Sequence, residues 1–417
     1  MTIKTVRNLR RISQVIFFCI FFWLILKTSF EIDLSPSDTS EISLPYPVSI
    51  ALQFDPLVAL TTLLANGTLY KGLLWSLVIL IPTIFIGRFF CGWVCPLGSL
   101  NQWCSEIPSE RFGRKGKGKM ESNRYRKYQR IKYYVFFFLT ATALAGSLQA
   151  GLLDPLPLLA RSIGTVVLPT LHTSAIGLLD QVKSFGMPRL SAAAQLAYDT
   201  LAPILLNFRQ MHFHAIFSIG LLFIAILLLN RLYTRFWCRA ICPLGAMLGL
   251  FSRFSFLGLK KDESSCDNCN QCLLHCQGAD NPDIGSRWRQ AECQLCMNCI
   301  AECPQGSLQF KFFPNQRVTT ANPAAISKID ISRRKTVASL AGGLALYPLM
   351  RSGDAFDINS NPKLIRPPGS VEEHDFLARC IRCGQCMRVC PNNALHPTLL
   401  ESGLEGIWTP IMIPRIG

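Results

Sequence analysis

The chain has 417 residues, a formal net charge of +16 and 50% hydrophobic residues, with a mean hydropathy of +0.28. This hydropathy is too high for an ordinary soluble protein of this length and predicts membrane-spanning segments. Much of the positive charge lies between Arg111 and Lys132, and no DNA- or RNA-binding motif accompanies it. We therefore expect no nucleic-acid partner and interpret this run as a cytoplasmic loop that follows the positive-inside rule.

Four apolar segments are predicted to cross the membrane as helices, because a bilayer core requires about 20 apolar residues and paired backbone groups. In chain order they cover residues 11–29, 73–90, 133–152 and 212–229. Residues 31–69 carry acidic side chains but no lysine or arginine, which is typical of the outer face. Residues 153–210 are predicted to form an outer loop with short helices. The N-terminus and the chain after Asn230 are then cytoplasmic.

An internal repeat supports this topology. The sequence RFFCGWVCPLG follows the second segment from Arg88, and RFWCRAICPLG follows the fourth from Arg235. The predicted fold is therefore an α-helical membrane domain of four transmembrane helices, arranged as two parallel two-helix repeats. Both cysteine pairs, one in each repeat, should lie at the cytoplasmic face.

Sixteen of the 18 cysteines fall in short clusters, and only Cys19 and Cys104 stand alone. Tight runs beside a cytoplasmic loop favour metal ligation over a secreted disulfide framework. No C-x-x-C-H sequence occurs, so this test excludes covalent attachment of c-type haem.

Eight cysteines form the pattern of a bacterial two-cluster ferredoxin, which is an α+β domain. Each of two runs reads C-x2-C-x2-C-x3-C, and the fourth cysteine of each run serves the other cluster. The first cluster is assigned to Cys266, Cys269, Cys272 and Cys303, and the second to Cys293, Cys296, Cys299 and Cys276. Structural zinc is the alternative, but the doubled arrangement favours two [4Fe–4S] clusters. One departure is that Gln277, and not proline, follows the first run.

A third run repeats the pattern without a complement. It consists of Cys380, Cys383, Cys386 and Cys390. The crossing rule requires a further cysteine downstream, and none follows in this chain. A third cluster could be closed locally by Cys390 or by a partner's ligand, but we favour a truncated or degenerate site.

The repeated pairs form a possible further metal or redox site, made of Cys91, Cys95, Cys238 and Cys242. They supply four ligands if the two halves face each other. The alternative is that C-x3-C-P only ends a helix, with the cysteines packing as small apolar side chains.

Two histidines begin the fourth segment near the outer face. His212 and His214 could accept protons from a quinol, because histidine titrates in the right range; interfacial anchoring is the alternative. His172, His275, His374 and His396 have no partner pattern and are expected to be incidental.

A twin-arginine pattern occurs in mid-chain, where Arg333 and Arg334 precede the apolar stretch from Val337 to Met350. At an N-terminus it would be typical of an export signal. Here it is either such a signal or a short helix of a cytoplasmic domain. The choice decides which side of the membrane the third cysteine run faces.

Together these motifs resemble the membrane-bound polyferredoxin family, which includes the quinol-dehydrogenase membrane component of the periplasmic nitrate reductase system. The resemblance covers about residues 1–310. From Ser332 onward, the twin-arginine segment, RPPG at 366–369, FLARCIRCGQCMRVCP and GLEGIWTPIMIPRIG are similar to the start of that component's ferredoxin-type partner. The chain resembles a fusion of the two proteins with the second cut short. The expected domains are 1–252 in the membrane, 253–325 as the ferredoxin and 326–417 as an incomplete ferredoxin-type domain.

The resemblance implies an electron-transfer component of a quinol dehydrogenase in the bacterial inner membrane, active in anaerobic respiration. Electrons would pass from quinol to ferredoxin-type or cytochrome proteins and a periplasmic reductase, with residues 351–417 in the periplasm. The alternative is an accessory, assembly or metal-reducing role for a respiratory enzyme. The sequence shows no acid–base or nucleophile constellation for independent catalysis.

Overall fold

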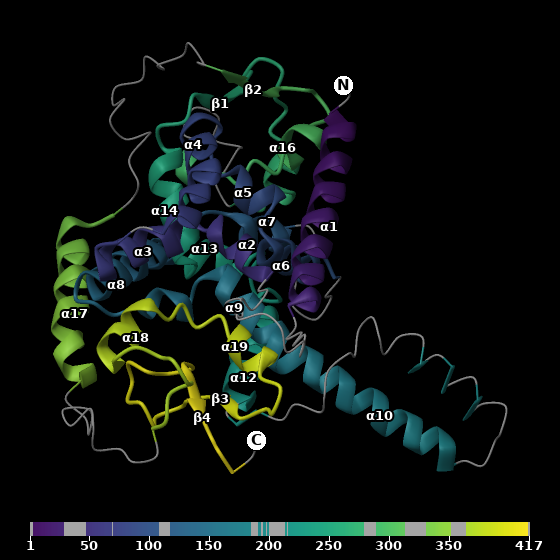
Figure 1. Cartoon of the computed structure of the whole chain (residues 1–417). Coiled ribbons are helices and arrows are strands. Elements are labelled where there is room, and N and C mark those ends of the chain that lie inside the picture. The colour runs from purple at the N-terminus through teal and green to yellow at the C-terminus, as the bar shows by residue number, and fades with distance from the viewer. Residues whose placement is uncertain are drawn as a thin grey trace.

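The computed structural model describes most of the chain and consists of a helical body with one cysteine-rich module at each end (Figure 1). The described residues are 3–28, 47–68, 70–107, 117–184, 191–192, 195–196, 198–199, 213–214, 216–278, 289–312, 331–351 and 364–415.

The helical body is built from two successive halves. The first contains α1 (Ile3–Lys27), α2 (Val48–Gln53), α3 (Pro56–Asn66), η1 (Lys71–Ser76), α4 (Leu77–Ile86), α5 (Phe89–Trp93) and α6 (Pro96–Glu106). The second contains α7 (Lys117–Asn123), η3 (Lys127–Arg130), α8 (Ile131–Leu144), η4 (Gln149–Leu152), α9 (Pro155–Ser162), η5 (Ile163–Val167), α10 (Leu168–Ser184), α12 (Ile216–Leu229), α13 (Phe236–Ala240) and α14 (Pro243–Ser252).

The repeat unit is longer than the sequence predicted. Before its cysteine pair, each half has an entering helix (α1 or α8), a middle helix (α3 or α9) and a returning helix (α4 or α12). Both middle helices begin with Asp-Pro-Leu, at Asp55 and Asp154. Proline is well placed there, because the first helical residue needs no amide partner. The duplicated unit therefore contains three helices and not two.

Among the described residues, two helices are long and apolar enough to cross a membrane, Thr5–Lys27 and the continuous helix Pro155–Ser184. The prediction of short helices was wrong for residues 155–184, because they form one continuous helix. Its early prolines lie in the first turn, and Pro169 follows the π-helical turn η5, which allows the helix to continue past a residue without an amide hydrogen.

The other predicted spans are shorter helices. The combined helix Lys71–Ile86 ends at Gly87, where φ is 114°. Helix α8 has 14 residues and is followed by Gly146 with φ of 91°. Helix α12 also has 14 residues, and His212 of the predicted fourth span lies outside the described residues.

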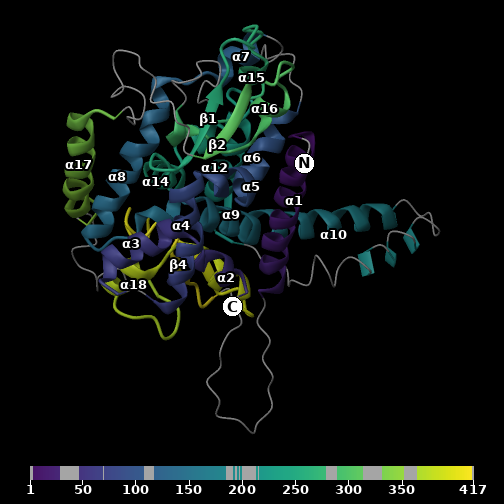
Figure 2. The ribbon, with the colours of Figure 1, turned by 90° about the horizontal axis from the view of Figure 1, so that it is seen from above.

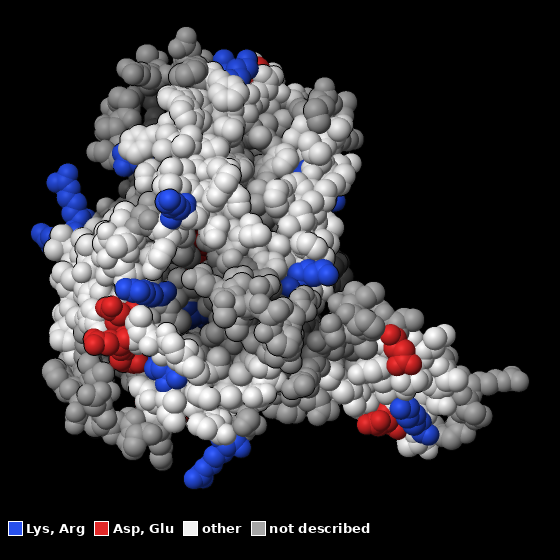
Figure 3. Space-filling model, in the orientation of Figure 1, with Lys and Arg blue, Asp and Glu red and all other residues white. Residues whose placement is uncertain are grey.

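Helix α1 buries polar side chains in its first half and exposes large apolar ones along its length. Arg10 and Gln14 are fully buried, whereas Ile12, Phe17 and Trp23 are exposed. Helix α12 likewise exposes large apolar side chains, and Figure 3 shows a face with few, scattered charges. This is the reverse of a helix on a water-soluble protein and fits helices that face lipid.

The first cysteine module has the expected α+β form. Strand β1 (Leu257–Lys261) pairs antiparallel with β2 (Leu308–Phe312), with Leu257 opposite Phe312. Between the strands lie α15 (Gln271–Leu274), η7 (Gln290–Glu292) and α16 (Asn298–Ala301).

The second module follows helix α17 (Arg333–Arg351) and contains α18 (Glu373–Arg379), α19 (Gln385–Val389) and the antiparallel strands β3 (Leu395–Pro397) and β4 (Pro410–Met412). Helix α17 carries the twin-arginine pattern and lies beside α8 (Figure 2). The Ser332 amide donates to the Tyr134 hydroxyl at 3.2 Å. At the other end the Tyr347 hydroxyl lies close to Gly146, so the two helices run in the same direction.

Helix α1 connects the two ends of the molecule. Near its start, Arg10 donates to the Asn298 side chain of the first module at 3.3 Å. Near its end, the Leu26 carbonyl accepts from Arg388 of the second module at 3.3 Å. Sixteen helical residues span about 24 Å. The two cysteine modules therefore lie at opposite ends of the helical body (Figure 1).

Candidate iron–sulfur sites

The four predicted ligands of the first cluster lie around one pocket. Cys266, Cys269 and Cys272 line it from the first run, and Cys303 lines it from the second. The pocket holds about 360 Å³ of empty space, including its open side. Burial acts against ionisation of Cys303, but hydrogen bonds from Ser307 and neighbouring amides outweigh it and hold the pKa below its usual value. This donor set fits a thiolate-bound cluster.

The second predicted ligand set is more deeply buried. Cys276, Cys293, Cys296 and Cys299 are all at least nine-tenths buried. The Asn298 side chain donates to the His275 carbonyl at 3.3 Å, which holds the end of the first run against the second. The end of the first run, which includes Cys276, therefore lies beside the second run, and the assignment of the ligands to two clusters stays a prediction.

All three cysteine runs share one strained loop conformation. The second and fourth residues after the first cysteine have positive φ in each run: Asn268 and Asn270, Leu295 and Met297, Arg382 and Gly384. Left-handed conformations cost a non-glycine residue about 1–2 kcal/mol and persist where function requires them. The third run therefore forms the same loop as the two complete runs.

The zinc alternative requires thiolates about 2.3 Å from one centre. Within the described residues, no three His, Cys, Asp or Glu side chains converge on one ion in this way.

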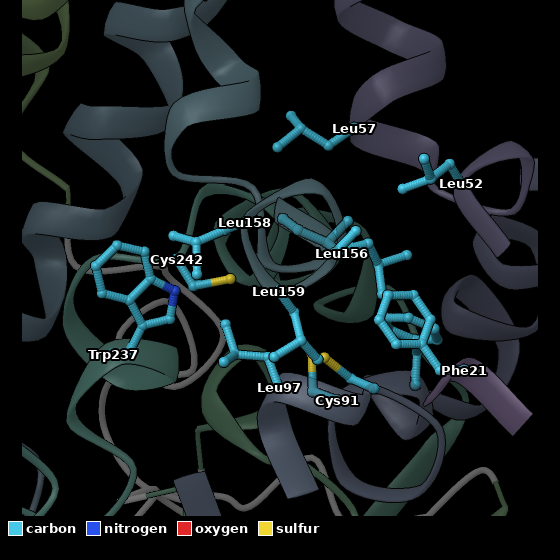
Figure 4. Packing of buried hydrophobic residues seen from close by; sticks show 14 of the residues in the cluster. Phe21, Leu52, Leu57, Cys91, Leu97, Leu156, Leu158, Leu159, Trp237 and Cys242 are labelled. Carbon is cyan, nitrogen blue, oxygen red and sulfur yellow. The ribbon is translucent and has the colours of Figure 1, made fainter. Parts of the chain in front are cut away.

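The two repeated pairs meet in the core of the helical body. Cys91 and Cys238 lie on α5 and α13, and Cys95 and Cys242 cap α6 and α14. All four are buried, and their thiols are close enough to interact electrostatically. Figure 4 shows Cys91 and Cys242 within the same leucine-rich core. We call this group the core quartet.

The thiols of the core quartet accept hydrogen bonds from each half. Cys95 Sγ accepts from the Gly98 amide at 3.4 Å, and Cys242 Sγ accepts from the Gly245 amide at 3.2 Å. Asn101 Nδ2 lies 3.7 Å from Cys238 Sγ. Burial opposes negative charge at these sulfurs, and the helix N-termini and the hydrogen-bond donors offset part of that cost.

Two buried arginines cross between the halves beside the core quartet. Arg88 Nη2 lies 3.8 Å from Cys91 Sγ and also reaches Gly245 of the other half. Arg235 Nη2 donates to the carbonyls of Cys91 and Gly98 at 3.1 and 2.7 Å. A buried cation is costly without negative charge nearby. Neutral thiols do not supply that charge, whereas the thiolates of a cluster do.

The buried charges around this core are mostly positive. Arg10, Arg88, Lys132, Arg235 and Arg239 are almost inaccessible to solvent. Among described residues, the buried carboxylate beside them is Glu292, which contacts Lys132 and lies 3.9 Å from Arg88. The excess of cations fits an anionic cluster better than four apolar cysteines.

The loop of the second cluster rests directly on the core quartet. A Cβ on Gly92 would lie 2.1 Å from the Gln294 carbonyl oxygen. Trp93 Nε1 donates to the Leu295 carbonyl at 2.9 Å, and Arg88 Nη1 donates to the Ala291 carbonyl at 3.0 Å. Gly92 is required at this position, because any side chain would separate the two sites.

The third run docks onto the other end of the helical body. Arg161 Nη1 donates to the Arg382 carbonyl at 2.7 Å. A Cβ on Gly151 would lie 2.1 Å from the Ile381 carbonyl oxygen. Cys380, Cys383 and Cys386 interact with one another, and Cys390 directly follows α19. The run is therefore part of the folded body.

The histidines combine in a way that the sequence did not indicate. His396, expected to be incidental, is buried, and its Nδ1 accepts from the His214 amide at 3.2 Å. Their ring centroids are 5.1 Å apart. His212 lies outside the described residues.

Sequence reasoning missed the buried charges. Arg88 and Arg235 open the repeated motif, so the duplication itself could have marked them. Asp55 and Asp154 also carried a signal, the Asp-Pro-Leu sequence in each half. The contact between Lys132 and Glu292 joins residues 160 positions apart and had no local signal.

Family models match the segments that contain the core quartet and the third run, whose function the cysteine spacing alone did not decide. Residues 68–115 and 215–261 match a family model described as a 4Fe–4S binding domain. Residues 376–396 match a second model with the same description. The first two segments contain the pairs of the core quartet, and the third contains the third run. The chain thus carries ferredoxin-type iron–sulfur domains.

Three curated relatives are similar to parts of the chain. YccM of Escherichia coli, named as a candidate electron transport protein, is 23% identical over 239 residues, 57% of this chain and 54% of YccM. The methylamine utilization ferredoxin-type protein MauM of Methylorubrum extorquens is 42% identical over 74 residues, 18% of this chain and 31% of MauM. The ferredoxin-type protein NapG of Escherichia coli is 35% identical over 81 residues, 19% of this chain and 35% of NapG.

The chain therefore spans about half of YccM and about a third of the two ferredoxin-type relatives. It is homologous to electron-transport proteins over these lengths. No solved structure matches it.

Proposed function

We propose that this chain is a membrane-bound electron-transfer protein that carries iron–sulfur clusters at both ends and in the core of its helical body. Two clusters are assigned to the crossed ligand sets of the first module and one to the core quartet. A further site is assigned to the third run, for which this chain supplies Cys380, Cys383, Cys386 and Cys390. The observation that carries the proposal is the pair of buried arginines that reach across the core quartet.

The sites follow one another along α1. Arg10 lies at the level of Asn298 in the second run, and Gln14 Nε2 donates to the Gly92 carbonyl at the core quartet at 2.8 Å. The carbonyl of Leu26 meets the third-run module. Four and twelve helical residues separate these levels, which corresponds to about 6 and 18 Å along the axis. This order suits an electron path through the body.

The orientation follows from charge. Arg333 and Arg334 begin α17 at the end of the body that carries the first module. We place this end and the N-terminus in the cytoplasm, following the positive-inside rule. The module of residues 364–415 then lies on the periplasmic side of the inner membrane. The domains 1–252, 253–325 and 326–417 remain our proposed division.

The electron donor is proposed to be quinol and the acceptor a periplasmic reductase such as nitrate reductase, reached through ferredoxin-type or cytochrome proteins. The support is the resemblance of the motifs to the quinol-dehydrogenase component of anaerobic respiration. The relatives' names do not agree on one partner, since MauM is named for methylamine utilization.

The test is reduction of the purified clusters by a quinol analogue. The protein is purified anaerobically in detergent, and the visible absorbance of the clusters is followed after addition of the analogue and then of dithionite. We expect the analogue to bleach part of the absorbance that dithionite bleaches. Bleaching by dithionite alone would contradict quinol oxidation and favour the accessory or metal-reducing role.

A further inference from the structure

Two carboxyl groups from the two halves meet inside the helical body. Asp55 and Asp154 are both fully buried and lie at equivalent positions, each directly before the proline that begins α3 or α9. Their side chains are within hydrogen-bonding distance of each other. The duplication therefore places one carboxyl from each half at the same point.

The carboxyl groups have few other partners. One oxygen of Asp55 accepts from the Leu57 amide at 2.9 Å and from the Val58 amide at 3.5 Å, and its other oxygen is buried without a hydrogen-bond donor in the described part of the chain. The donor nearest to the buried carboxyl of Asp154 is the Leu156 amide, at the equivalent position of the second half. Ionising both carboxyl groups at this separation costs much free energy, because the two negative charges repel each other. The pair is therefore expected to share one proton.

No cation on the neighbouring elements is placed to neutralise the pair. Helices α2, α4, α12 and α14 and the turns η4 and η5 carry no charged residue. Charged or titratable groups on the other packed elements are Lys71 on η1, Cys104 and Glu106 on α6, Lys132, Tyr133 and Tyr134 on α8, Arg161 on α9, and Glu373, His374, Asp375 and Arg379 on α18.

These groups are engaged elsewhere or lie outside the pair's surroundings. Lys132 contacts Glu292, and Arg161 donates to the Arg382 carbonyl. Helix α18 meets α3 at Asn66, the far end from Asp55. The remaining favourable field comes from the N-termini of α3 and α9, which stabilises about one negative charge.

The pair lies between the third run and the core quartet. Gly151, three residues before Asp154, contacts the Ile381 carbonyl, and Ile381 also packs on Val58 and Ala59 just after Asp55. On the other side, Leu57 and Leu156 share one apolar core with Cys91 and Cys242 (Figure 4). In such a medium, a change of charge at either redox site acts strongly on a nearby carboxylate.

We propose that Asp55 and Asp154 form a redox-linked proton site. When the core quartet or the third-run site beside the pair is oxidised, the pair shares one proton and carries one negative charge. When one electron enters that site, one proton from water adds to the free carboxylate, and the pair becomes neutral. On oxidation the electron and the proton leave together, and no other bond forms or breaks. This proposal rests on the proposed electron-transfer function.

The test combines infrared difference spectra with redox titrations of the full chain in detergent. We compare the native protein with Asp55→Asn, Asp154→Asn and the control Asp180→Asn, whose carboxylate is exposed on α10. In the native protein and the control, reduction should produce a carboxylic-acid band that shifts in D2O. A tenfold change in proton concentration should move the midpoint potential by up to about 59 mV per electron. Both effects should be lost in each asparagine variant.

The outcomes separate the two proposals. If no reducible cluster is found, the electron-transfer function fails. If clusters are reduced in the native protein without a carboxylic-acid band and without pH dependence, only the proton site is overturned. A band that persists in Asp55→Asn and Asp154→Asn also overturns it. Should one variant fold poorly, as judged by iron content, the native spectrum and the other variant still decide the question.

Discussion

The pocket of the first cluster and the core quartet each bring together four cysteines, but their environments are opposite. Cys269 is exposed, and Cys266, Cys272 and Cys303 are only partly buried. All four cysteines of the core quartet are buried, with Arg88 and Arg235 beside them. The open pocket suits exchange of electrons with a partner, whereas the core quartet suits transfer within the protein.

The two sites also differ in how the protein stabilises negative charge. At the open pocket, water and the hydroxyl of Ser307 are available to the sulfurs. At the core quartet, arginines and helix N-termini must do this work without solvent. Negative charge on the cysteine sulfurs is therefore stabilised by solvent exposure at the open pocket and by fixed charges at the core quartet.

Loss of iron should separate the two sites most strongly. Under mild oxidation with a chelator, the first cluster should lose its iron quickly because its ligands are accessible. The core quartet must open first, and an opening free energy of about 4 kcal/mol slows release about a thousandfold. Iron retained on the chain, measured over time, should fall in clearly separated phases. A single phase would show that the two environments do not differ in access.

Removal of one buried arginine should affect the core quartet more than the first cluster. Arg88→Met and Arg235→Met each leave a buried negative centre without its cation, at a cost of about 3–5 kcal/mol. We expect loss of iron from the core quartet or a marked fall in thermal stability, measured by iron analysis and calorimetry. The control Arg253→Met removes an exposed arginine and should change neither. Equal behaviour of all three variants would contradict the assigned role.

The contact between the core quartet and the second cluster can be weakened by one methyl group. Gly92→Ala would place its Cβ 2.1 Å from the Gln294 carbonyl, and overpacking of this kind costs about 1–3 kcal/mol. Electron transfer between the two sites, followed by rapid-mixing spectroscopy, should slow. Gly177→Ala has open space around its Cβ and serves as the control. An unchanged rate of electron transfer in Gly92→Ala would show that this contact does not contribute to transfer between the two sites.

The smallest expected effect is at the open pocket. Ser307→Ala removes the hydroxyl that lies 3.2 Å from Cys303 Sγ. A hydrogen bond worth about 0.5–1.5 kcal/mol corresponds to a decrease of about 20–60 mV in the potential of a one-electron cluster. Potentiometric titration should show this for the first cluster alone. Ser264→Ala, whose hydroxyl contacts Asp262, should leave the potential unchanged.

Much of this arrangement was predictable because cysteine ligation depends on short, local spacing. The spacing of the runs from Cys266 to Cys303 is sufficient to indicate an α+β module, and the duplicated motifs indicate two facing halves. The pocket that joins Cys303 to the first run follows the same crossing rule.

The remainder depends on contacts between distant segments. Residues 155–184 read as a loop because of their prolines, whereas a π-helical turn allows one continuous helix. Arg88 donates to the Ala291 carbonyl of the first module, and Asp55 meets Asp154 of the other half. No local pattern specifies which carbonyl or carboxyl a buried side chain will meet after two halves pack together.

The account depends most on the core quartet as a cluster site. Iron and acid-labile sulfide are measured per chain in the anaerobically purified native protein, in a variant with Cys91→Ser and Cys238→Ser, and in the control Cys104→Ser. The double variant should contain about four fewer irons and sulfides per chain than the native protein. The control, which changes a cysteine outside the runs, should match the native protein. Equal iron and sulfide in all three would contradict the central claim.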